Sequence, residues 1–546
     1  MSIAEKLASI AAGTPQSDVV AGSEQERAIS ENLRAFLESL GLETGVYEFE
    51  ALSWEERYVE VGFKGLKLRS VALPYSLPGE AEGKVVYVGG RILEDEWASI
   101  DLSGKIALVK FFSKVDEAEW QYIRAVRAGA EAVVFMDNYP NRLRKMVLTL
   151  NTDYRFTEGT PPPIPAVAVS LEDGLRILKL AHRGEKLLVR VDTKVDHYSR
   201  SRVVYAGSLE GPVFSAHIDK WLSGFTDDVL GVGVVMLLAE RLRDSAGYIF
   251  FGSEESGAPG YSPWYWIWGS RSFAEYLEKT GLLDDFGMLL NVDTLGGREV
   301  RVSASTPDVQ EGIADAIGSS ARICPDQVIF DSFSFTMKGI PSTTTHTFPE
   351  VLPVYHTDMD TPAFVDWQGV ERAVRVLERI ATEFAAKRWG MFKYAELTRR
   401  IAERLERVSH LPSAAKAVEL LQSLRLDSEE SARQVRRALT GPMFWGRYDR
   451  VFRDSEVYYP LFTDAIDDLV LLSDILAGAR SPADVAGMKG LRRISGFEVV
   501  LPSVEPVFYG RVLSSPGFLK ELYLVLERVV EKDINTLVER LQALKK

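Results

Sequence analysis

Three short apolar runs in the middle of the chain each lead into side chains that can carry chemistry. Uninterrupted apolar runs of this length are typical of strands buried on both faces of a sheet. Between the first two runs, residues 229–243 have apolar positions at helical spacing and predict a helix. Because open α/β sheets bind ligands at the carboxyl ends of their strands, the pattern predicts an α/β fold with a site at that edge. The runs are residues 213–216, 248–251 and 288–292, and the side chains that follow them are His217, Asp219, Glu254, Glu255 and Asp293.

The flanking regions have different patterns. Residues 23–41 predict a helix that ends at Gly41, and two strands are expected next, at 43–49 and 57–63. Residues 66–200 contain short strand-like runs around one helical pattern, namely strands at 83–88, 104–109, 132–135 and 165–169 and a helix at 117–128. The remainder is largely helical by periodicity, with helices expected at 394–408, 413–423, 428–439, 462–476 and 516–544. A chain of 546 residues is too long for one core, so we expect several domains.

The composition narrows the classes of partner. The formal net charge of −14 disfavours nucleic acid and anionic membrane surfaces. The single cysteine, Cys324, excludes a disulfide framework. The first residues lack the basic and apolar segments of a secretory signal, and no run approaches the ~20 apolar residues of a membrane span. We therefore expect a cytoplasmic protein with no nucleic-acid or membrane partner.

The side chains at the strand ends suggest metal chemistry. His217 and Asp219 are two residues apart, so on an extended strand they point to the same side. A histidine beside a carboxylate is a common metal ligand, and Asp227, ten residues after His217, could close on the same ion. Glu254 and Glu255 are neighbours whose side chains diverge, so one can bind a metal while the other takes a proton from the attacking water. Any single acid is more often a solvated surface charge, and only the combination is specific.

Two later stretches complete a set of five motifs that resembles the di-zinc exopeptidases of peptidase family M28. The resemblance is greatest to the glutamate carboxypeptidase II and transferrin receptor branch. Trp221 and the D-x-x-x-G pattern from Asp227 to Gly231 also fit. The motifs are His217-x-Asp219, Asp227 ten residues after His217, Glu254-Glu255, Asn291-x-Asp293 and Tyr355-His356-Thr357-x-x-x-Thr361.

The resemblance implies two zinc ions, for which Co²⁺ or Mn²⁺ could substitute. Asp227 would bridge the ions, one of which would also be held by His217 and Asp293. The ligands of the other ion would be Asp227, Glu255 and His356. Glu254 would be the general base, Tyr355 would hydrogen-bond the oxyanion, and Asp219 would support His217. Asp228 departs from the family pattern, which more often has Asn or Pro there, and we expect its side chain to point away from the ions.

The same resemblance implies the architecture. The expected fold is α/β, with a zinc-exopeptidase catalytic domain that has a mixed central sheet, an inserted β-rich protease-associated (PA) domain and a C-terminal helical domain. The catalytic domain would be discontinuous, formed by residues 1–65 and 200–390. The PA-like insert would span residues 66–199. Residues 391–546 would form the helical domain, which resembles a dimerisation domain, so we expect a homodimer.

Several residues outside the expected ligand set are open to more than one interpretation. Arg142, Arg144 and Lys145 of the insert are read as solvated loop charges, with substrate contacts as the alternative. The aromatic stretch 264–268 is either a pocket wall or a packing surface. His346 is read as a loop histidine outside the ligand set. Arg301 is a candidate for contacting acidic substrates.

The function expected from these motifs is hydrolysis of terminal peptide bonds in peptides, with aminopeptidase activity preferred. A carboxypeptidase or dipeptidase similar to glutamate carboxypeptidase is the first alternative. A non-catalytic receptor-like binding protein is the second, although all five ligands and the base are present. A glutaminyl cyclase-like acyltransferase with one zinc ion is the third. Metal content together with hydrolysis of amino-acid anilides separates these functions.

Overall fold

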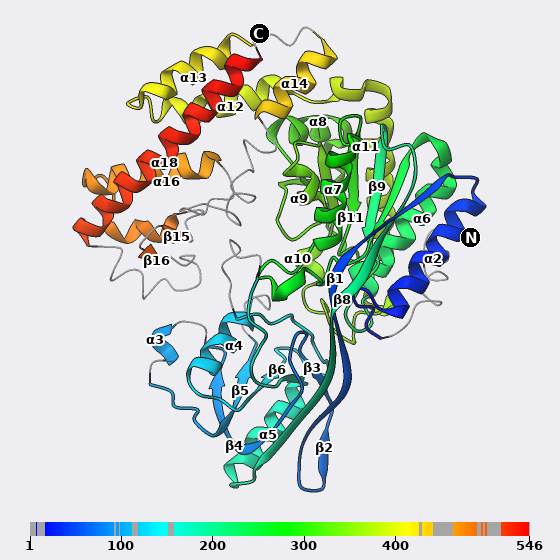
Figure 1. Ribbon diagram of the computed structural model, residues 1–546, viewed down its shortest axis with the longest axis vertical. Coiled ribbons are helices and arrows are strands. Elements are labelled where there is room, and N and C mark those ends of the chain that lie inside the picture. Colours follow the sequence, from blue (N-terminus) through cyan, green and yellow to red (C-terminus); the bar gives the residue numbers. More distant parts are fainter. Residues whose placement is uncertain are drawn as a thin grey trace.

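The computed structural model describes residue 7 and residues 17–91, 94–97, 99–111, 118–150, 158–424, 428–439, 462–488, 493–494, 497–498 and 515–544. Its centre is a sheet in which the three predicted apolar runs lie side by side (Figure 1). The parallel strands of this sheet are β9 (Pro212–His217), β10 (Gly247–Phe251), β11 (Met288–Val292) and β14 (Ser342–His346). Beyond β14, β12 (Arg301–Ala304) is antiparallel to it and β13 (Arg322–Pro325) forms the edge.

The central strands are buried on both faces because helices cover each side. Alternate residues of a strand point to opposite faces, and in β10 Tyr248 and Phe250 belong to one hydrophobic core while Ile249 and Phe251 belong to another. The first core also contains residues of α2 (Glu24–Ser39), α6 (Leu230–Leu242), α8 (Pro307–Ile317) and α11 (Trp367–Lys387). The second core contains residues of α7 (Trp268–Thr280) and α9 (Ser332–Thr336).

A long antiparallel ribbon joins the central sheet to the insert. It consists of β1 (Thr44–Phe63) and β8 (Leu187–Gly207), and β8 also pairs with β10. The predicted pair of strands at 43–49 and 57–63 is wrong, because they are parts of the single strand β1. Two register shifts, between Ala51 and Ser53 and between Glu56 and Tyr58, let the ribbon bend without ending. Position 199/200, the predicted domain boundary, lies within β8.

The insert contains its own parallel strands, which continue the sheet through β8. They are β4 (Gly79–Gly89), β5 (Lys105–Lys110), β6 (Ala132–Met136) and β7 (Ala166–Val169). Short strands β2 (Leu66–Leu68) and β3 (Ser70–Ala72) pair with β1 and β7. The helices are α3 (Glu94–Trp97), α4 (Ala118–Arg127), which lies within the predicted helix 117–128, and α5 (Leu171–His182), which the pattern did not predict. Residue 117 lies outside the described residues.

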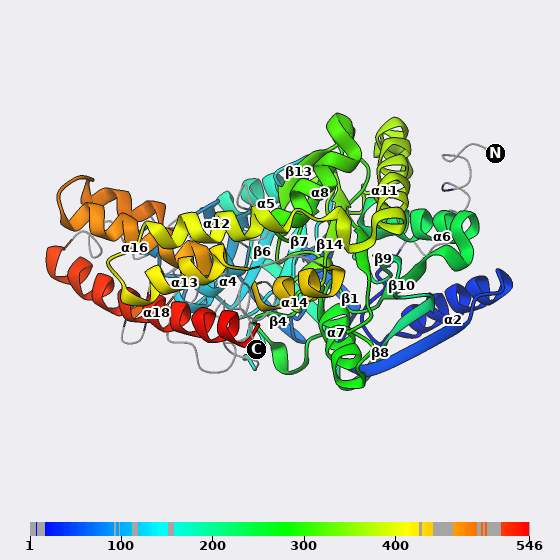
Figure 2. The ribbon, with the colours of Figure 1, turned by 90° about the horizontal axis from the view of Figure 1, so that it is seen from above.

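The C-terminal helices lie to one side of the central sheet, as the view from above shows (Figure 2). Their bounds are within two residues of the predicted ones: α12 (Tyr394–Glu406), α13 (Pro412–Gln422), α14 (Glu429–Leu439), α16 (Phe462–Leu476) and α18 (Pro516–Ala543). A small antiparallel pair, β15 (Arg493–Ile494) and β16 (Phe497–Glu498), lies between α16 and α18 in sequence. No helix among the described residues is long and apolar enough to cross a membrane. The predicted α/β fold with an insert and a helical C-terminal region is confirmed.

The apolar stripe of α18 packs on its own chain. Seven of its residues are at most 2% exposed and share a core with residues of α13 and α16: Leu519, Leu522, Leu526, Val530, Ile534, Leu537 and Leu541. The stripe motivated the expectation of a homodimer, but intramolecular packing now accounts for it. A second subunit would have to contact a different surface of the helical region, and the homodimer stays a prediction.

Candidate metal centre

The structure brings all five predicted ligands together at the carboxyl edge of the central sheet. They come from β9, from the segment after it, from the segments after β10 and β11, and from the loop after α10 (Phe348–Val351). Their ligand atoms form two groups, and within each group the atoms lie within 4.8 Å of one another. One group is His217, Asp227 and Asp293, and the other is Asp227, Glu255 and His356. All five residues are buried.

Asp227 is shared because its two oxygens face different imidazoles. Its Oδ1 lies 3.1 Å from Nε2 of His217, and its Oδ2 lies 3.3 Å from Nε2 of His356. The distance from His217 Nε2 to Asp293 Oδ1 is 4.0 Å, and that from His356 Nε2 to Glu255 Oε2 is 2.8 Å. The arrangement therefore offers two neighbouring cation positions with Asp227 between them.

The segment that carries Asp227 is held from both sides. It forms one irregular turn, Phe225–Val229, in which Asp227 and Asp228 have non-helical backbone angles. The N–H of Thr226 donates to both carboxylate oxygens of Asp360, each at 3.0 Å. Asp360 therefore positions the segment from the far side of the site.

Asp228 points away from the ligands, as expected. Its Oδ2 accepts a hydrogen bond from the backbone N–H of His217 at 3.3 Å. Its Oδ1 occupies the space above Gly231, where an added Cβ would lie 2.2 Å from that oxygen. This contact explains the glycine of the D-x-x-x-G pattern. Burial raises the pKa of Asp228 well above its usual range.

Contrary to the prediction, the carboxylate of Asp219 does not support His217 but binds a different part of the site. The backbone carbonyl of Asp219, rather than its side chain, is the partner of His217 Nδ1, at 3.0 Å; the nearest carboxylate oxygen is 3.7 Å away. The carboxylate instead accepts the backbone N–H groups of Glu254 and Glu255, each at 2.9 Å. Asp219 thus fixes the turn that presents both glutamates, which the spacing of the sequence did not indicate.

Glu254 is the acid of the pair that belongs to neither ligand group. Its Oε2 lies 3.9 Å from His217 Nε2, within the same buried cluster. Burial raises the pKa of Glu254 well above its usual range, and the charges of Asp293, Asp331 and Glu255 raise it further while His217 lowers it. A carboxylate in such surroundings is a strong proton acceptor, as a general base requires.

Asp331 is a site residue that the sequence analysis missed. It precedes α9 and it is fully buried. Burial raises its pKa to about 7, and its charge in turn raises the pKa values of Glu254 and Asp293. No recognised motif marks this position, so only its place beside the glutamates identifies it.

Tyr355 lies against its neighbour His356. The two rings stack with centroids 3.7 Å apart, and Phe348 contacts Tyr355 edge-on. Burial raises the pKa of Tyr355 well above its usual range, and Asp227, Glu255, Glu254 and Asp293 add to the effect. The phenol therefore stays protonated and can donate a hydrogen bond.

His346 takes no part in the ligand groups. It ends β14 rather than lying in a loop, so this detail of the prediction is wrong. Its Nε2 is 3.0 Å from Ser303 Oγ, and burial lowers its pKa to about 3. Arg301 begins the neighbouring strand β12 and forms an ion pair with Glu299 at 3.3 Å.

Two of the three basic residues of the insert, Arg144 and Lys145, are buried in ion pairs within the molecule. Arg144 and Lys145 are buried, and only Arg142 is partly exposed. Nζ of Lys145 lies 2.5 Å from Asp18 Oδ2 and 3.0 Å from Glu56 Oε2. Both interpretations are therefore wrong for Arg144 and Lys145, because tertiary contacts enclose them between the insert and the central sheet.

The aromatic stretch 264–268 is a packing surface. Trp264 is buried in the core of the C-terminal helices, and Trp266 Nε1 donates to the carbonyl of Val328 at 2.8 Å. Tyr265 packs instead on Tyr75 at the base of the insert. The stretch thus joins three parts of the chain.

Comparisons with known proteins agree with this geometry. Residues 208–381 match the profile of peptidase family M28, and residues 81–177 match that of the PA domain. The fold is similar to that of a zinc aminopeptidase from Bacillus subtilis, with 19% sequence identity and a TM-score of 0.55 over 70% of this chain and 94% of that chain. It is also similar to a peptidase M28 precursor from Shewanella amazonensis, with 18% identity and a TM-score of 0.55 over 70% and 92% of the chains. No curated protein matches the sequence.

The class of protein follows from the fold, the site and these matches. Residues 208–381 match peptidase family M28 and residues 81–177 match the PA domain, and both ligand groups lie within the first of these segments. The expected resemblance to this family is confirmed. The carboxypeptidase and receptor branch within the family stays a prediction.

Proposed function

We propose that the protein is a two-zinc exopeptidase that removes residues from the amino terminus of peptides. The observation that carries this proposal is the pair of ligand groups that share Asp227, with Glu254 beside them as an acid that binds neither ion. Imidazole and carboxylate ligands are those that zinc prefers. Oε1 of Glu255 is buried and has no hydrogen-bond partner among the described residues, as expected of an atom that a cation satisfies.

The residues of the chain have separate tasks in this reaction. The two ions, when bound, polarise the attacking water and the scissile carbonyl. Glu254 takes the proton of that water and delivers it to the leaving amine. The phenol of Tyr355 donates a hydrogen bond to the carbonyl oxygen as negative charge develops on it. Asp219 keeps Glu254 and Glu255 in register through its two backbone contacts.

The charge of the site supports an amino-terminal rather than a carboxyl-terminal substrate group. Asp228 and Asp331 are left out of the charge balance, because burial raises their pKa values toward the neutral form. The five other buried acids still carry more charge than two divalent ions neutralise: Asp219, Asp227, Glu254, Glu255 and Asp293. Such a surplus attracts an α-ammonium group and repels a terminal carboxylate. The ion pair of Arg301 with Glu299 leaves that arginine poorly placed to receive an acidic substrate. The similarity to a protein named as a zinc aminopeptidase also supports this preference.

Peptide digestion tests the proposal. A set of peptides with free and acetylated amino termini, and with free and amidated carboxyl termini, would be incubated with the protein and read by mass spectrometry. We expect stepwise loss from free amino termini alone. Loss from carboxyl termini would favour the carboxypeptidase alternative. Binding of two ions without hydrolysis would favour a receptor-like protein.

Removal of the general base provides a second test. Glu254→Gln should lower kcat by ~10²–10⁴-fold, the contribution expected of a general base, while both ions stay bound. Removal of the ions by a chelator should abolish turnover, and added Zn²⁺ should restore it. A fully active protein without bound metal would contradict the proposed mechanism.

A further inference from the structure

The two candidate metal ligands His217 and His356 are oriented by different parts of the chain. Each imidazole has its Nδ1 beside a backbone carbonyl, an arrangement that fixes the ring and leaves Nε2 for a metal. For His217 this carbonyl belongs to Asp219, two residues away at the end of the same strand. For His356 it belongs to Lys145 of the insert, at 3.2 Å and 211 positions away in sequence. The N–H of Lys145 donates in return to the carbonyl of His356 at 3.0 Å.

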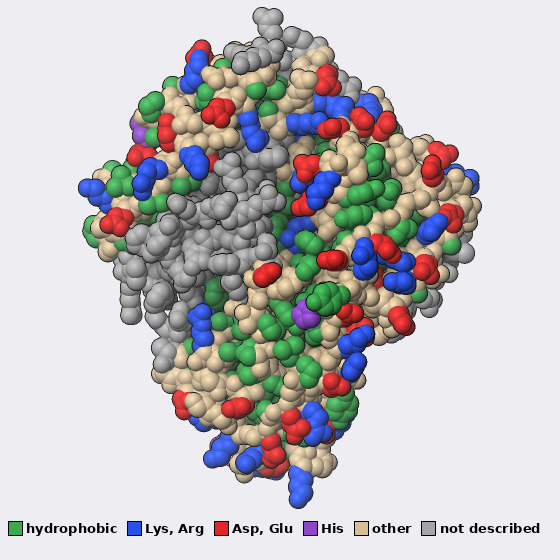
Figure 3. Space-filling view, in the orientation of Figure 1, with side chains coloured by type: hydrophobic (Ala, Val, Ile, Leu, Met, Phe, Trp, Pro, Cys, Tyr) green, Lys and Arg blue, Asp and Glu red, His purple; other side chains and the backbone are tan. Residues whose placement is uncertain are grey.

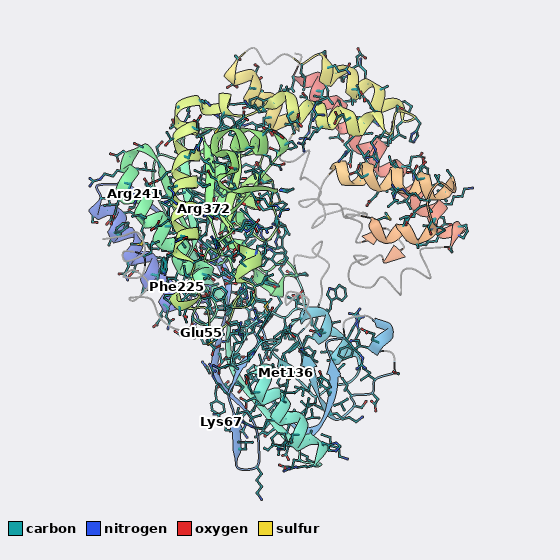
Figure 4. All side chains as sticks on the ribbon, turned by 180° about the vertical axis from the view of Figure 1, so that it is seen from behind. Glu55, Lys67, Met136, Phe225, Arg241 and Arg372 are labelled. Carbon is teal, nitrogen blue, oxygen red and sulfur yellow. The ribbon has the colours of Figure 1, made fainter. Side chains whose placement is uncertain are left out.

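Arg144 connects the loop before His356 to the sheet of the insert. Its side chain is 0% exposed, and its Nε lies 2.9 Å from Oδ2 of Asp137. Asp137 directly follows β6, which ends at Met136, a residue labelled within the insert in Figure 4. The Nη atoms of Arg144 donate to the backbone carbonyls of Leu352, Pro353 and Tyr355. The strand β6 therefore sets the position of this loop through one buried side chain.

The loop is also held after His356. The carboxylate of Asp358 accepts the N–H of Leu143 at 2.9 Å, and the N–H of Asp358 donates to the carbonyl of Leu143 at 3.3 Å. Asp358 further forms an ion pair with Arg69. The insert thus contacts the loop on both sides of the ligand.

The backbone of His356 needs such support. Its φ of +56° lies in the left-handed region, which is unfavourable for a residue with a Cβ. Conformations of this kind persist where the surroundings over-determine them. The carbonyl contacts of Arg144 and Lys145 supply that restraint.

The ribbon of β1 and β8 runs from the central sheet to the insert (Figure 1). Figure 4 labels Phe225 in the central region, Met136 in the insert and Glu55 on the ribbon between them. On the face shown in Figure 3, acidic and basic side chains are interspersed over both regions. Arg144 and Lys145 are instead buried, and their charges pair with acids inside the molecule.

We propose that the PA-like insert is a positioning element of the Asp227–Glu255–His356 site, acting through Arg144, and that it sets the affinity of this site for its ion. Two ligands of the other site have partners outside the insert: His217 contacts Asp219 and Asp228, and Asp293 donates its N–H to the carbonyl of Thr345 in β14. Asp227 is common to both sites, so the sites differ in these two ligands and in Glu255 and His356. The inference rests on the proposed two-ion function and deepens it, because it makes the two sites separable by mutation in a domain that contains no ligand.

Zinc titration of the metal-free full-length protein tests this. Arg144→Lys keeps the charge opposite Asp137 but cannot span the three carbonyls. We expect one of the two binding steps, measured in competition with a chromophoric chelator, to weaken by ~10–100-fold, as for the loss of a group that orients a metal-binding histidine. The other step should not change. In a His356→Ala background, Arg144→Lys should have no further effect on the remaining ion.

Arg436 provides a matched control. It is equally buried, its Nε lies 3.1 Å from Oδ2 of Asp308, and it donates to the carbonyl of Gly339. Arg436→Lys should lower the thermal stability to a similar extent and leave both zinc affinities unchanged. If Arg144→Lys does not fold, Asp358→Asn weakens the same docking contact at a partly exposed position and should weaken the same binding step to a smaller degree.

Two results would overturn the inference. One is a folded Arg144→Lys or Asp358→Asn protein with both wild-type zinc affinities. The other is an equal loss at both sites, shared by Arg436→Lys, which would show general destabilisation. A wild-type protein that binds fewer than two ions overturns the proposed function first, and the inference falls with it.

Discussion

Substitution of Asp219 by Asn separates two ways in which this residue can support the site. In the structure its backbone carbonyl orients His217, whereas its carboxylate binds the N–H groups of Glu254 and Glu255 at 2.9 Å each. Asn keeps the backbone carbonyl that orients His217, and its side-chain oxygen can still accept one of the two N–H groups. Its NH₂ group then faces the other N–H, which loses its acceptor. The substitution therefore removes one of the two contacts of the turn and leaves His217 oriented.

The expected magnitude follows from the lost contact. A hydrogen bond to a charged acceptor contributes about 1.5–3 kcal/mol, and the N–H that loses it stays buried. If the turn is needed in the transition state, about 2–3 kcal/mol corresponds to a ~30–150-fold lower kcat/KM, since 1.36 kcal/mol is tenfold in rate. Because His217 keeps its partner, affinity for the ion on His217 and Asp293 should not change.

Kinetics on a peptide substrate, urea unfolding and zinc titration of Asp219→Asn would measure these quantities. Ser170→Ala is the control, because it removes the side-chain cap of α5 in the insert and should cost ~1 kcal/mol of stability without changing kcat/KM. An Asp219→Asn protein with wild-type kcat/KM would refute the role of the carboxylate. Selective loss of the ion on His217 would show that the side chain, and not the carbonyl, orients this histidine.

Three further predictions concern the zinc content, the pH dependence of stability and the oligomeric state. Glu255→Gln should lower the zinc content to one ion per chain, whereas Glu254→Gln keeps two; equal contents by elemental analysis would contradict the assignment. Burial raises the pKa of Glu26 from 4.5 to about 8. Between these pH values the folded metal-free protein keeps the proton on Glu26, whereas the unfolded chain releases it. The stability that this proton contributes below pH 4.5 is therefore lost as the pH rises to 8. Between pH 5 and 9 the free energy of unfolding of the wild type should fall by on the order of 3–4 kcal/mol more than that of Glu26→Gln, whose side chain cannot ionise. Urea unfolding measures both, and parallel pH profiles would argue against the shifted pKa. The helical region should mediate a homodimer, and light scattering that gives the 60.9 kDa mass of one chain at all micromolar concentrations would exclude it.

Much of the fold and all five candidate ligands could be predicted from the sequence. The apolar runs before His217 and before the Glu254-Glu255 pair are local patterns. Such uninterrupted runs indicate strands that are buried on both faces of a sheet. The C-terminal helices were placed within two residues because amphipathic periodicity is likewise local. The ligand set was implied by the resemblance of the five motifs to family M28, and the structure brings these residues together.

Tertiary structure alone decided what covers each apolar face and where each charge goes. The stripe of α18 has the same periodicity whether it meets a second subunit or, as here, α13 and α16. Arg144 has the sequence context of a loop charge, yet it is buried because its partners, Asp137 and the loop before His356, reach it only in the folded chain. Asp331 belongs to no motif and becomes part of the site through proximity to Glu254. Periodicity along a chain reports the polarity of a face, but the free energy of a buried charge depends on partners that are distant in sequence.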